Sequence, residues 1–206
     1  PKNACSTIKS TLLNKFINGY LIDTPPHKTA SIHLNSQLDF DKDFFCLVRN
    51  PFTRFISGFA DKCHPDGDKN IWLPICSRYG FDSKKSISMD QLLDAFLCDN
   101  PNLINSHFRP QHKLLCSNLI TPKKVFYMEQ MKVLDAFFKK KDIKLVRFSP
   151  HSTKNRAIQP NQISDGTLSK IKSLYKQDFS YYGYSTNPLN IEPVKPLVKT
   201  PRVSML

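Results

Sequence analysis

The sequence predicts an α/β fold, a three-layer sandwich in which helices cover both faces of a mainly parallel central sheet. Two observations support this prediction. Short apolar runs alternate along the chain with longer segments whose apolar residues recur at helical spacing. The run FFCLV at residues 44–48 is apolar at every position, which is typical of a strand buried on both faces of a parallel sheet.

The N-terminal part of the chain is expected to contain two helices and two strands. Residues 7–18 predict a helix because their apolar side chains fall on one face. Residues 31–35 and 44–48 predict strands, and the proline pair within residues 23–28 indicates a loop. Residues 52–62 predict a second amphipathic helix directly after the buried strand.

The rest of the chain is expected to be less regular. Residues 63–86 are polar with scattered aromatic residues and predict irregular structure. Further helices are expected over residues 88–98, where Ser88 and Gln91 have capping-box spacing, and over residues 130–140 and 164–179. Further strands are expected over residues 125–128 and 145–148. The last residues are proline-rich and lack periodicity, which predicts a domain over residues 1–186 and a tail over 187–206.

The chain carries a large positive charge, +13 over 206 residues. Such a surplus favours anionic partners, among them nucleotide phosphates, acidic glycans, nucleic acid and an anionic membrane face. The lysines are spread over many segments, and no known nucleic-acid-binding motif is present. A non-catalytic polyanion- or nucleic-acid-binding α/β domain is therefore the alternative to an enzyme.

The six cysteines predict no metal site, because none of them forms a CxxC pair and no ligand cluster is apparent in the sequence. Cys46 lies in the apolar run and is expected in the core. Both disulfides and free thiols fit the cysteines of the polar middle of the chain, which are Cys63, Cys76, Cys98 and Cys116.

The first candidate binding segment is PKNACSTIK at residues 1–9, a polar loop that runs into a helix. Backbone N–H groups at such a junction, together with Lys2 and the hydroxyls of Ser6 and Thr7, can hold a phosphate or sulfate group. The GxxxxGK[ST] pattern of P-loop nucleotidases is absent. Taken alone, the segment also fits a capped surface helix.

The second candidate segment is VRNPFTRFISGF at residues 48–59, which follows the buried strand. Arg49 leaves the end of the strand, and Ser57 lies two helical turns further along the chain. A guanidinium and a hydroxyl in this arrangement can hold a phosphate group. Taken alone, this segment also fits an ordinary strand, turn and helix with a surface arginine.

Together the two segments resemble the membrane-type carbohydrate sulfotransferases and their bacterial relatives, a family that includes the HNK-1, chondroitin, dermatan and heparan 2-O enzymes. The resemblance implies a P-loop-like fold that binds the sulfonate donor 3'-phosphoadenosine-5'-phosphosulfate (PAPS) and releases adenosine 3',5'-bisphosphate (PAP). In this family the first segment binds the 5'-phosphosulfate and the second binds the 3'-phosphate. The donor-binding residues that it implies here are Lys2, Asn3, Ala4, Cys5, Ser6, Thr7, Lys9, Arg49 and Ser57.

Two further stretches extend the resemblance to about residue 185. NSHFRPQ at residues 105–111 looks like the family's HW.PQ segment, with Phe108 in place of Trp. LYKQDF at residues 174–179, followed by Gly183 and Tyr184, looks like the end of the family's domain. The resemblance implies in-line transfer of a sulfonate group to a carbohydrate hydroxyl, with a general base.

The candidate catalytic residues are one cation and two histidines. Lys2 is expected to offset the charge that develops on the leaving phosphate. His33 lies in the interval where heparan 2-O-type relatives have a base histidine, and His107 in the HFRPQ stretch is the alternative base. Glu129 is a further candidate, either as the base or as a residue that orients a histidine. The residues expected to line the acceptor groove, where a solvated loop also fits, are Arg109, His112 and Lys113.

The expected partner is a carbohydrate acceptor and not nucleic acid. A compact chain rich in lysine and asparagine is more similar to the bacterial members, so a cytoplasmic location is expected, with the Golgi lumen or a membrane as the alternative. Because the chain begins at Pro1 inside a candidate binding loop, we expect the first strand of the domain to lie upstream.

Overall fold

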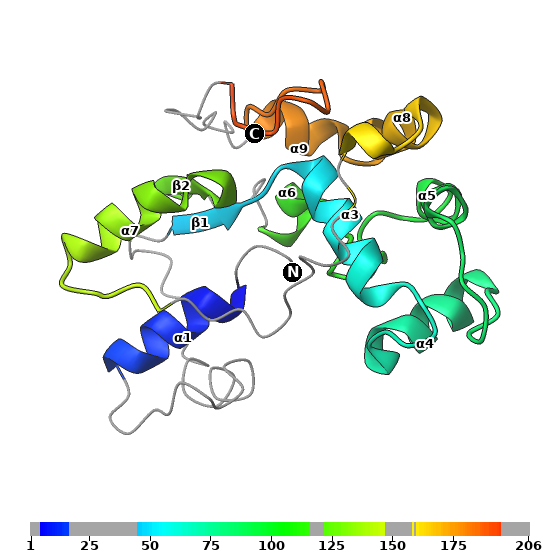
Figure 1. The fold of residues 1–206 in the computed structure, drawn as a ribbon, viewed down its shortest axis with the longest axis horizontal. Helices are drawn as coiled ribbons and strands as arrows, with labels where there is room; N and C mark the ends of the chain where they lie inside the picture. Colours follow the sequence, from blue (N-terminus) through cyan, green and yellow to red (C-terminus); the bar gives the residue numbers. More distant parts are fainter. Residues whose placement is uncertain (1–4, 17–44, 116–121, 147–157, 159, 195–206) are drawn as a thin grey trace, which may run out of the picture.

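The computed structural model of the chain describes residues 5–16, 45–115, 122–146, 158 and 160–194. In this part, helices surround a small sheet of two parallel strands, β1 (Phe45–Val48) and β2 (Lys124–Tyr127) (Figure 1). The predicted combination of helices with a parallel sheet is therefore confirmed. The three-layer sandwich and the P-loop-like fold stay predictions.

The helices agree with most of the expected ranges. The helices predicted over residues 7–18, 52–62, 88–98 and 130–140 correspond to α1, α3, α5 and α7 in the described part of the chain. The strands predicted over residues 44–48 and 125–128 correspond to β1 and β2, except that Met128 belongs to a 3-10 turn. In chain order the described helices are α1 (Cys5–Phe16), α3 (Pro51–Lys62), α4 (Lys69–Tyr79), α5 (Met89–Leu97), α6 (Gln111–Leu114), α7 (Met131–Lys139), α8 (Asp165–Leu174) and α9 (Lys176–Tyr181). Short 3-10 turns at Met128–Gln130 and Pro160–Gln162 precede α7 and α8.

Both faces of the sheet are covered. Successive side chains of a strand point to opposite faces. On β1, Cys46 and Val48 belong to a large apolar cluster, whereas Phe45 and Leu47 pack against a smaller one. This is the environment that the uninterrupted apolar run predicts.

The expectation of irregular structure over residues 63–86 is wrong, because this stretch contains α4. The side chain of Asp68 caps the helix by accepting a hydrogen bond from the Asn70 N–H, and Gly80 ends it with a left-handed φ of 72°. Ile71, Trp72, Ile75 and Cys76 are buried along it. Pro74 inside the helix hid this pattern, since proline usually breaks a helix.

The helix predicted over residues 164–179 is interrupted and forms two helices, α8 and α9. The break lies at Tyr175, whose φ of -108° and ψ of 21° leave the helical region. The ring of Tyr175 is fully buried, and its hydroxyl donates a hydrogen bond of 2.6 Å to the Phe108 carbonyl. Tertiary contacts therefore override the local helical pattern at this position.

The strand predicted over residues 145–148 is not formed in its described half. Leu145 and Val146 have no strand partner there, and the Val146 N–H donates instead to the Thr11 hydroxyl of α1 over 2.9 Å. The strand predicted over residues 31–35 lies outside the described residues.

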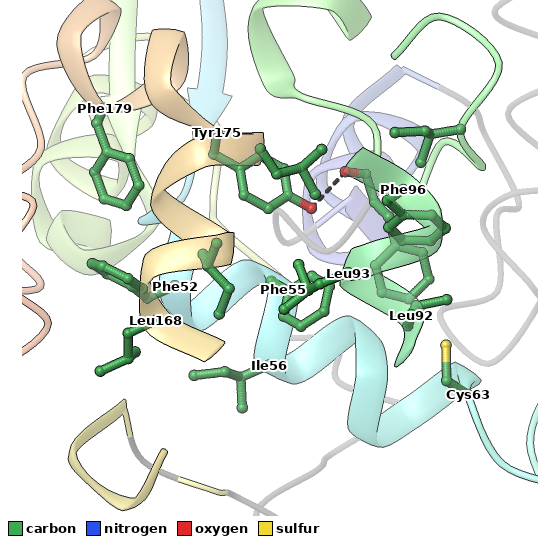
Figure 2. Close-up of a cluster of buried hydrophobic side chains, with 14 of the residues drawn as sticks. Phe52, Phe55, Ile56, Cys63, Leu92, Leu93, Phe96, Leu168, Tyr175 and Phe179 are labelled. Carbon is green, nitrogen blue, oxygen red and sulfur yellow. Dashed lines mark hydrogen bonds between the residues drawn. The ribbon is translucent and has the colours of Figure 1, made fainter. Parts of the chain in front are cut away.

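The large apolar cluster joins α3, α5 and α8 (Figure 2). Burying one such side chain stabilises the fold by about 1.5–3 kcal/mol. The hydrogen bond from Tyr175, dashed in Figure 2, ties the loop before α6 to the junction of α8 and α9. The labelled members of the cluster are Phe52, Phe55, Ile56, Cys63, Leu92, Leu93, Phe96, Leu168, Tyr175 and Phe179.

The smaller cluster holds α1 and α7 on the other face of the sheet. Ile8 of α1 packs against a core of Phe126, Leu134, Phe138 and Ile143. In Figure 1, α1 and α9 accordingly lie on opposite sides of β1. The N-terminal segment therefore enters the fold on the face opposite to the large cluster.

Four cysteines have a described side chain, and all four are free thiols. Cys46, Cys63 and Cys76 are buried and Cys98 is exposed, while Cys116 lies outside the described residues. Cys46 is 7% exposed within the large apolar cluster, which confirms its place in the core, and this burial raises the pKa of its thiol to about 12. Over the described ranges, no helix has both the length and the apolar character needed to cross a membrane.

The close approach of α3 to the loop before α6 yields a first prediction. A Cβ at Gly58 would lie 3.0 Å from Cε1 of Phe108, so Gly58→Ala forces a shift in a packed core. We expect the free energy of unfolding to fall by about 1–3 kcal/mol, although alanine is the better helix former. Urea titration followed by circular dichroism measures this change.

Gly166→Ala in α8 is the matched control for this substitution. Its new Cβ would meet only the Ser164 hydroxyl at 3.9 Å. This variant should gain about 0.4–1 kcal/mol, because alanine restricts the unfolded chain. Equal stability of the two variants would show that α3 does not pack closely against Phe108.

Candidate functional site

The candidate site is built around Arg49 and Asn50, the two residues that join β1 to α3. Because the strands are parallel, with Val48 opposite Tyr127, this turn lies beside the residues that follow β2. Ligands of α/β proteins usually bind at the carboxyl ends of such strands. The buried Asn50 caps α3, since its Oδ1 accepts hydrogen bonds from the N–H groups of Phe52 (3.0 Å) and Thr53 (3.4 Å).

Gln111 holds the turn through its side-chain amide, which binds both backbone groups of Arg49. Oε1 accepts from the Arg49 N–H over 2.9 Å, and Nε2 donates to the Arg49 carbonyl over 2.8 Å. The amide thus pairs with this residue as a neighbouring strand would. Gln111 is only 1% exposed, so its loss would leave buried polar groups of Arg49 without these partners.

Asp178 in turn holds Gln111 at the start of α6. Its Oδ2 accepts from the Gln111 N–H over 2.6 Å, and its Oδ1 accepts from the His112 N–H over 2.9 Å. The same Oδ1 lies 2.6 Å from Nδ1 of the His112 ring. A fully buried carboxylate needs such donors, and here they fix α6 to α9.

Glu129 braces the turn from the β2 side. Its Oε1 accepts from the Asn50 N–H over 2.9 Å, and its Oε2 accepts from the Tyr184 hydroxyl over 2.8 Å. Burial raises the pKa of the Glu129 carboxyl above its ordinary value, while Asn50, Tyr184 and the Arg49 charge oppose this shift. Both carboxylate oxygens thus serve the turn in this structure.

The segment after Tyr184 closes over the same turn. Nδ2 of Asn50 donates to the Ile191 carbonyl over 3.2 Å, and Nε2 of Gln130 donates to Glu192 over 3.3 Å. The N–H of Val194 donates to the Gly183 carbonyl over 2.8 Å. Ile191 and Glu192, within the predicted tail over 187–206, therefore contact the site.

The side chain of Arg49 runs along α3. Its Nε donates to the Thr53 hydroxyl over 3.1 Å, and Ser57 lies one turn further on the same helix face. Burial lowers the pKa of the Arg49 guanidinium, the Glu129 carboxylate opposes this shift, and the Arg54 cation adds to it. An arginine stays charged even then. Arg49, Thr53 and Ser57 are here called the α3 polar row. The Thr53 hydroxyl donates to the Asn50 carbonyl over 3.2 Å, so the row offers the Arg49 cation and the Ser57 hydroxyl to an anion.

Arg54 is a second cation of α3, and it is fully buried. Its Nη2 donates to the Ser106 carbonyl over 3.2 Å, and its guanidinium lies 5.9 Å from the centre of the Tyr175 ring. Nε and Nη1 have no hydrogen-bond partner within the described residues. Arg54 thereby fixes the loop that carries His107.

The predicted acceptor residues and the predicted base His107 lie along one stretch of chain. In the loop, Asn105 Oδ1 accepts from the His107 N–H over 3.0 Å and lies 3.0 Å from Nδ1 of its ring. Nε of Arg109 donates to the Ile104 carbonyl over 3.1 Å. Lys113 is exposed on α6. The stretch from His107 to Lys113 therefore lies beside the Arg49 turn, to which Gln111 binds it.

The structure describes the predicted donor-binding residues only in part. Arg49 and Ser57 share the α3 polar row, and Lys9 is half-buried on α1. Cys5, Ser6 and Thr7 form the first turn of α1, where only the backbone is described. The predicted site residues that lie outside the described residues are Lys2, Asn3, Ala4 and His33. In the described part of the chain, no cluster of three or more His, Cys, Asp or Glu residues is arranged to hold a metal ion.

The motifs in the sequence predicted no role for Gln111, Asp178 or Tyr184, although all three stand in the stretches that carry the resemblance. A signal was present, since Gln111 and Asp178 are polar residues next to apolar or proline neighbours in HFRPQ and QDF. Polar residues in such surroundings are often buried and hydrogen-bonded.

Comparison with known proteins identifies one family. A family model described as "Sulfotransferase family" matches residues 1–185. Comparison with curated proteins and with solved structures gives no significant match. The matched span includes the α3 polar row and the side chains of Gln111, Glu129, Asp178 and Tyr184 that hold the turn.

The two hydrogen bonds of Gln111 yield a second prediction. Gln111→Ala should lower the free energy of unfolding by about 1–3 kcal/mol, because it removes both hydrogen bonds of the side-chain amide to the backbone of Arg49. Gln177→Ala, at an exposed position of α9, is the matched control and should change stability by less than about 0.5 kcal/mol. Denaturant titration compares the two variants, and similar losses in both would mean that Gln111 does not hold the turn.

The raised pKa of Glu129 yields a third prediction. The folded protein binds the Glu129 proton more tightly than the unfolded chain does, so wild-type stability should fall relative to Glu129→Gln as the pH rises above the ordinary value of 4.5. Glutamine keeps an oxygen acceptor for the Asn50 N–H. Urea titrations of both proteins at a series of pH values measure the difference. A difference that is constant, or that favours the wild type as the pH rises, would contradict the raised pKa.

Proposed function

Because the chain belongs to the sulfotransferase family, we propose that it transfers a sulfonate group from PAPS to a hydroxyl of a carbohydrate. The observation that carries the proposal is the braced turn at Arg49. Gln111 and Glu129 hold its backbone from two sides, and the α3 polar row begins there. A site whose backbone is fixed before the ligand arrives binds an anion at a lower ordering cost.

The described residues fit the 3'-phosphate of PAPS. The planar guanidinium of Arg49 can donate two parallel hydrogen bonds to a phosphate, and the Ser57 hydroxyl can donate another. Arg54, also on α3, adds positive potential to the same helix. Arg49 and Ser57 are therefore the residues that we propose for the 3'-phosphate.

We propose that the first candidate segment, residues 1–9, binds the other anionic end of PAPS, the 5'-phosphosulfate. α1 spans 12 residues, and its N-terminal N–H groups carry the positive end of the helix dipole. The residues proposed for this end are Lys2, Asn3, Ala4, Cys5, Ser6, Thr7 and Lys9. The domain proposed to bring the two ends together is a P-loop-like, three-layer sandwich with β1 and β2 among its central strands.

The reaction would be an in-line displacement at sulfur. The acceptor oxygen attacks sulfur from the side opposite to the 5'-phosphate, and the bond between sulfur and the phosphate oxygen breaks. Negative charge grows on the departing phosphate, where Lys2 and the N-terminus of α1 would offset it. A base takes the proton of the hydroxyl, and the sequence offers His33 and His107 for this role.

The carbohydrate acceptor is supported by charge and by position. The stretch of residues 107–113 is hydrogen-bonded through Gln111 to the turn at Arg49 and Asn50, here called the donor turn. This stretch contains Arg109, His112 and Lys113. With a net charge of +13, the chain is suited to an acidic glycan. We propose these three residues as part of the acceptor groove.

Ligand binding tests this function. At a concentration of 100 times its Kd, PAP should stabilise the protein by about 2.7 kcal/mol, measured as a thermal shift. Arg49→Ala removes a charge-assisted hydrogen bond, worth about 1.5–3 kcal/mol, so PAP affinity should fall about tenfold to a hundredfold. Ser57→Ala removes a neutral one and should cost up to about tenfold.

Arg78→Ala is the matched control, because Arg78 pairs with Asp99 over 2.8 Å on α4 and is no part of the turn. Its PAP affinity should equal that of the wild type. ATP and a DNA duplex are tested in parallel. A shift with ATP or DNA but none with PAP would contradict the proposal, and a DNA shift would favour the polyanion-binding alternative.

A further inference from the structure

His112 and Asp178 form a buried pair beside the donor turn. Oδ1 of Asp178 lies 2.6 Å from Nδ1 of the His112 ring, and the carboxylate also accepts from the backbone N–H groups of Gln111 and His112. Its oxygens thus face hydrogen-bond donors, so Nδ1 carries the ring proton of the neutral imidazole. The tautomer that results has its free electron pair on Nε2.

Nε2 of His112 is the atom that a ligand would engage. It is buried and has no hydrogen-bond partner within the described residues. The side chain as a whole is 14% exposed. Buried ring nitrogens are nearly always hydrogen-bonded, so an unpaired acceptor at this place is suited to the hydroxyl group of a bound molecule.

The pair lies next to the residues that hold Arg49. His112 follows Gln111 on α6, and Asp178 binds the backbone N–H groups of both. The carboxylate that fixes the donor turn through Gln111 therefore also orients the His112 ring. We infer that His112 is the general base of the sulfonate transfer and that Asp178 is its positioning residue. This inference depends on the function proposed above.

The acceptor O–H gives its proton to Nε2 of His112 while its oxygen forms the new bond to sulfur. The bond between sulfur and the 5'-phosphate oxygen breaks, and its electron pair leaves with PAP. The Asp178 carboxylate stabilises the imidazolium, as in a Ser-His-Asp triad, and the proton then passes to solvent.

The partner of the ring distinguishes His112 from His107. Nδ1 of His107 lies against the neutral side-chain amide of Asn105. A neutral amide orients a ring but supplies no charge to stabilise an imidazolium, whereas the buried carboxylate of Asp178 supplies one. At Nδ1, the ring nitrogen that orients the imidazole, the Asp178 carboxylate therefore favours His112 as the base.

The test measures PAP release from PAPS in the presence of heparosan, unsulfated chondroitin, dermatan or water alone, and the fastest condition serves as reference. His112→Gln should lower this rate by about 10²- to 10⁴-fold while PAP still binds with wild-type affinity. His64→Gln, in the loop between α3 and α4, is the matched control and should keep the wild-type rate. His107→Gln should keep far more activity than His112→Gln.

A spectroscopic measurement distinguishes an effect on the orientation of the His112 ring from an effect on the stability of the protein. Nitrogen-15 NMR of the histidines should show the neutral His112 ring protonated at Nδ1, and Asp178→Asn should change this tautomer balance. A neutral wild-type ring protonated at Nε2, or a reference rate unchanged in His112→Gln, would overturn the inference and leave the proposed function standing. A wild type that neither binds PAP nor releases it from PAPS would overturn the proposed function, and the inference with it.

Discussion

The side-chain amide of Gln111, bonded to both the N–H and the carbonyl of Arg49, is the contact on which the geometry of the site depends. A strand end that leads into a helix would otherwise present backbone groups to solvent or to the ligand. Asp178 fixes Gln111 from α9, and Glu129 fixes the neighbouring Asn50 from the end of β2. Segments far apart in the chain therefore hold Arg49 and Asn50 in one position, and this position determines the direction of the Arg49 side chain.

The contacts of Gln111, Asp178 and Glu129 that hold the turn are polar, and this determines both their free-energy cost and their geometry. A buried carboxylate such as Asp178 is costly to remove from water unless each oxygen receives donors, and here they come from two backbone N–H groups and a ring nitrogen. Such hydrogen bonds have narrow geometry, whereas an apolar contact tolerates sliding. The network thus gives the turn a defined geometry, which the proposed binding of a phosphate in one orientation requires.

Local patterns were sufficient to predict the elements that bear Arg49 and Ser57, the residues proposed for the 3'-phosphate. The apolar run before Arg49 and the helical spacing after it depend only on near neighbours in the sequence, and the structure has β1 and α3 where these patterns indicate. α4 was hidden by Pro74, and the break at Tyr175 is imposed by a bond to Phe108. The hydrogen bonds of Gln111 to Arg49 and to Asp178 join residues more than sixty positions apart in the chain, and no local sequence pattern predicts such contacts.

α3 connects the stability of the fold with the proposed chemistry. Its buried face places Phe52, Phe55 and Ile56 in the large cluster, while its other face carries the α3 polar row. Because a helix is rigid over three turns, any change that tilts the buried face also moves Ser57 relative to Arg49. The glycine after Ser57 allows Phe108 to approach the helix axis, and Phe108 belongs to the same stretch as His107 and Gln111. Packing of one aromatic ring on α3 therefore sets the distance between the donor half and the acceptor half of the proposed site.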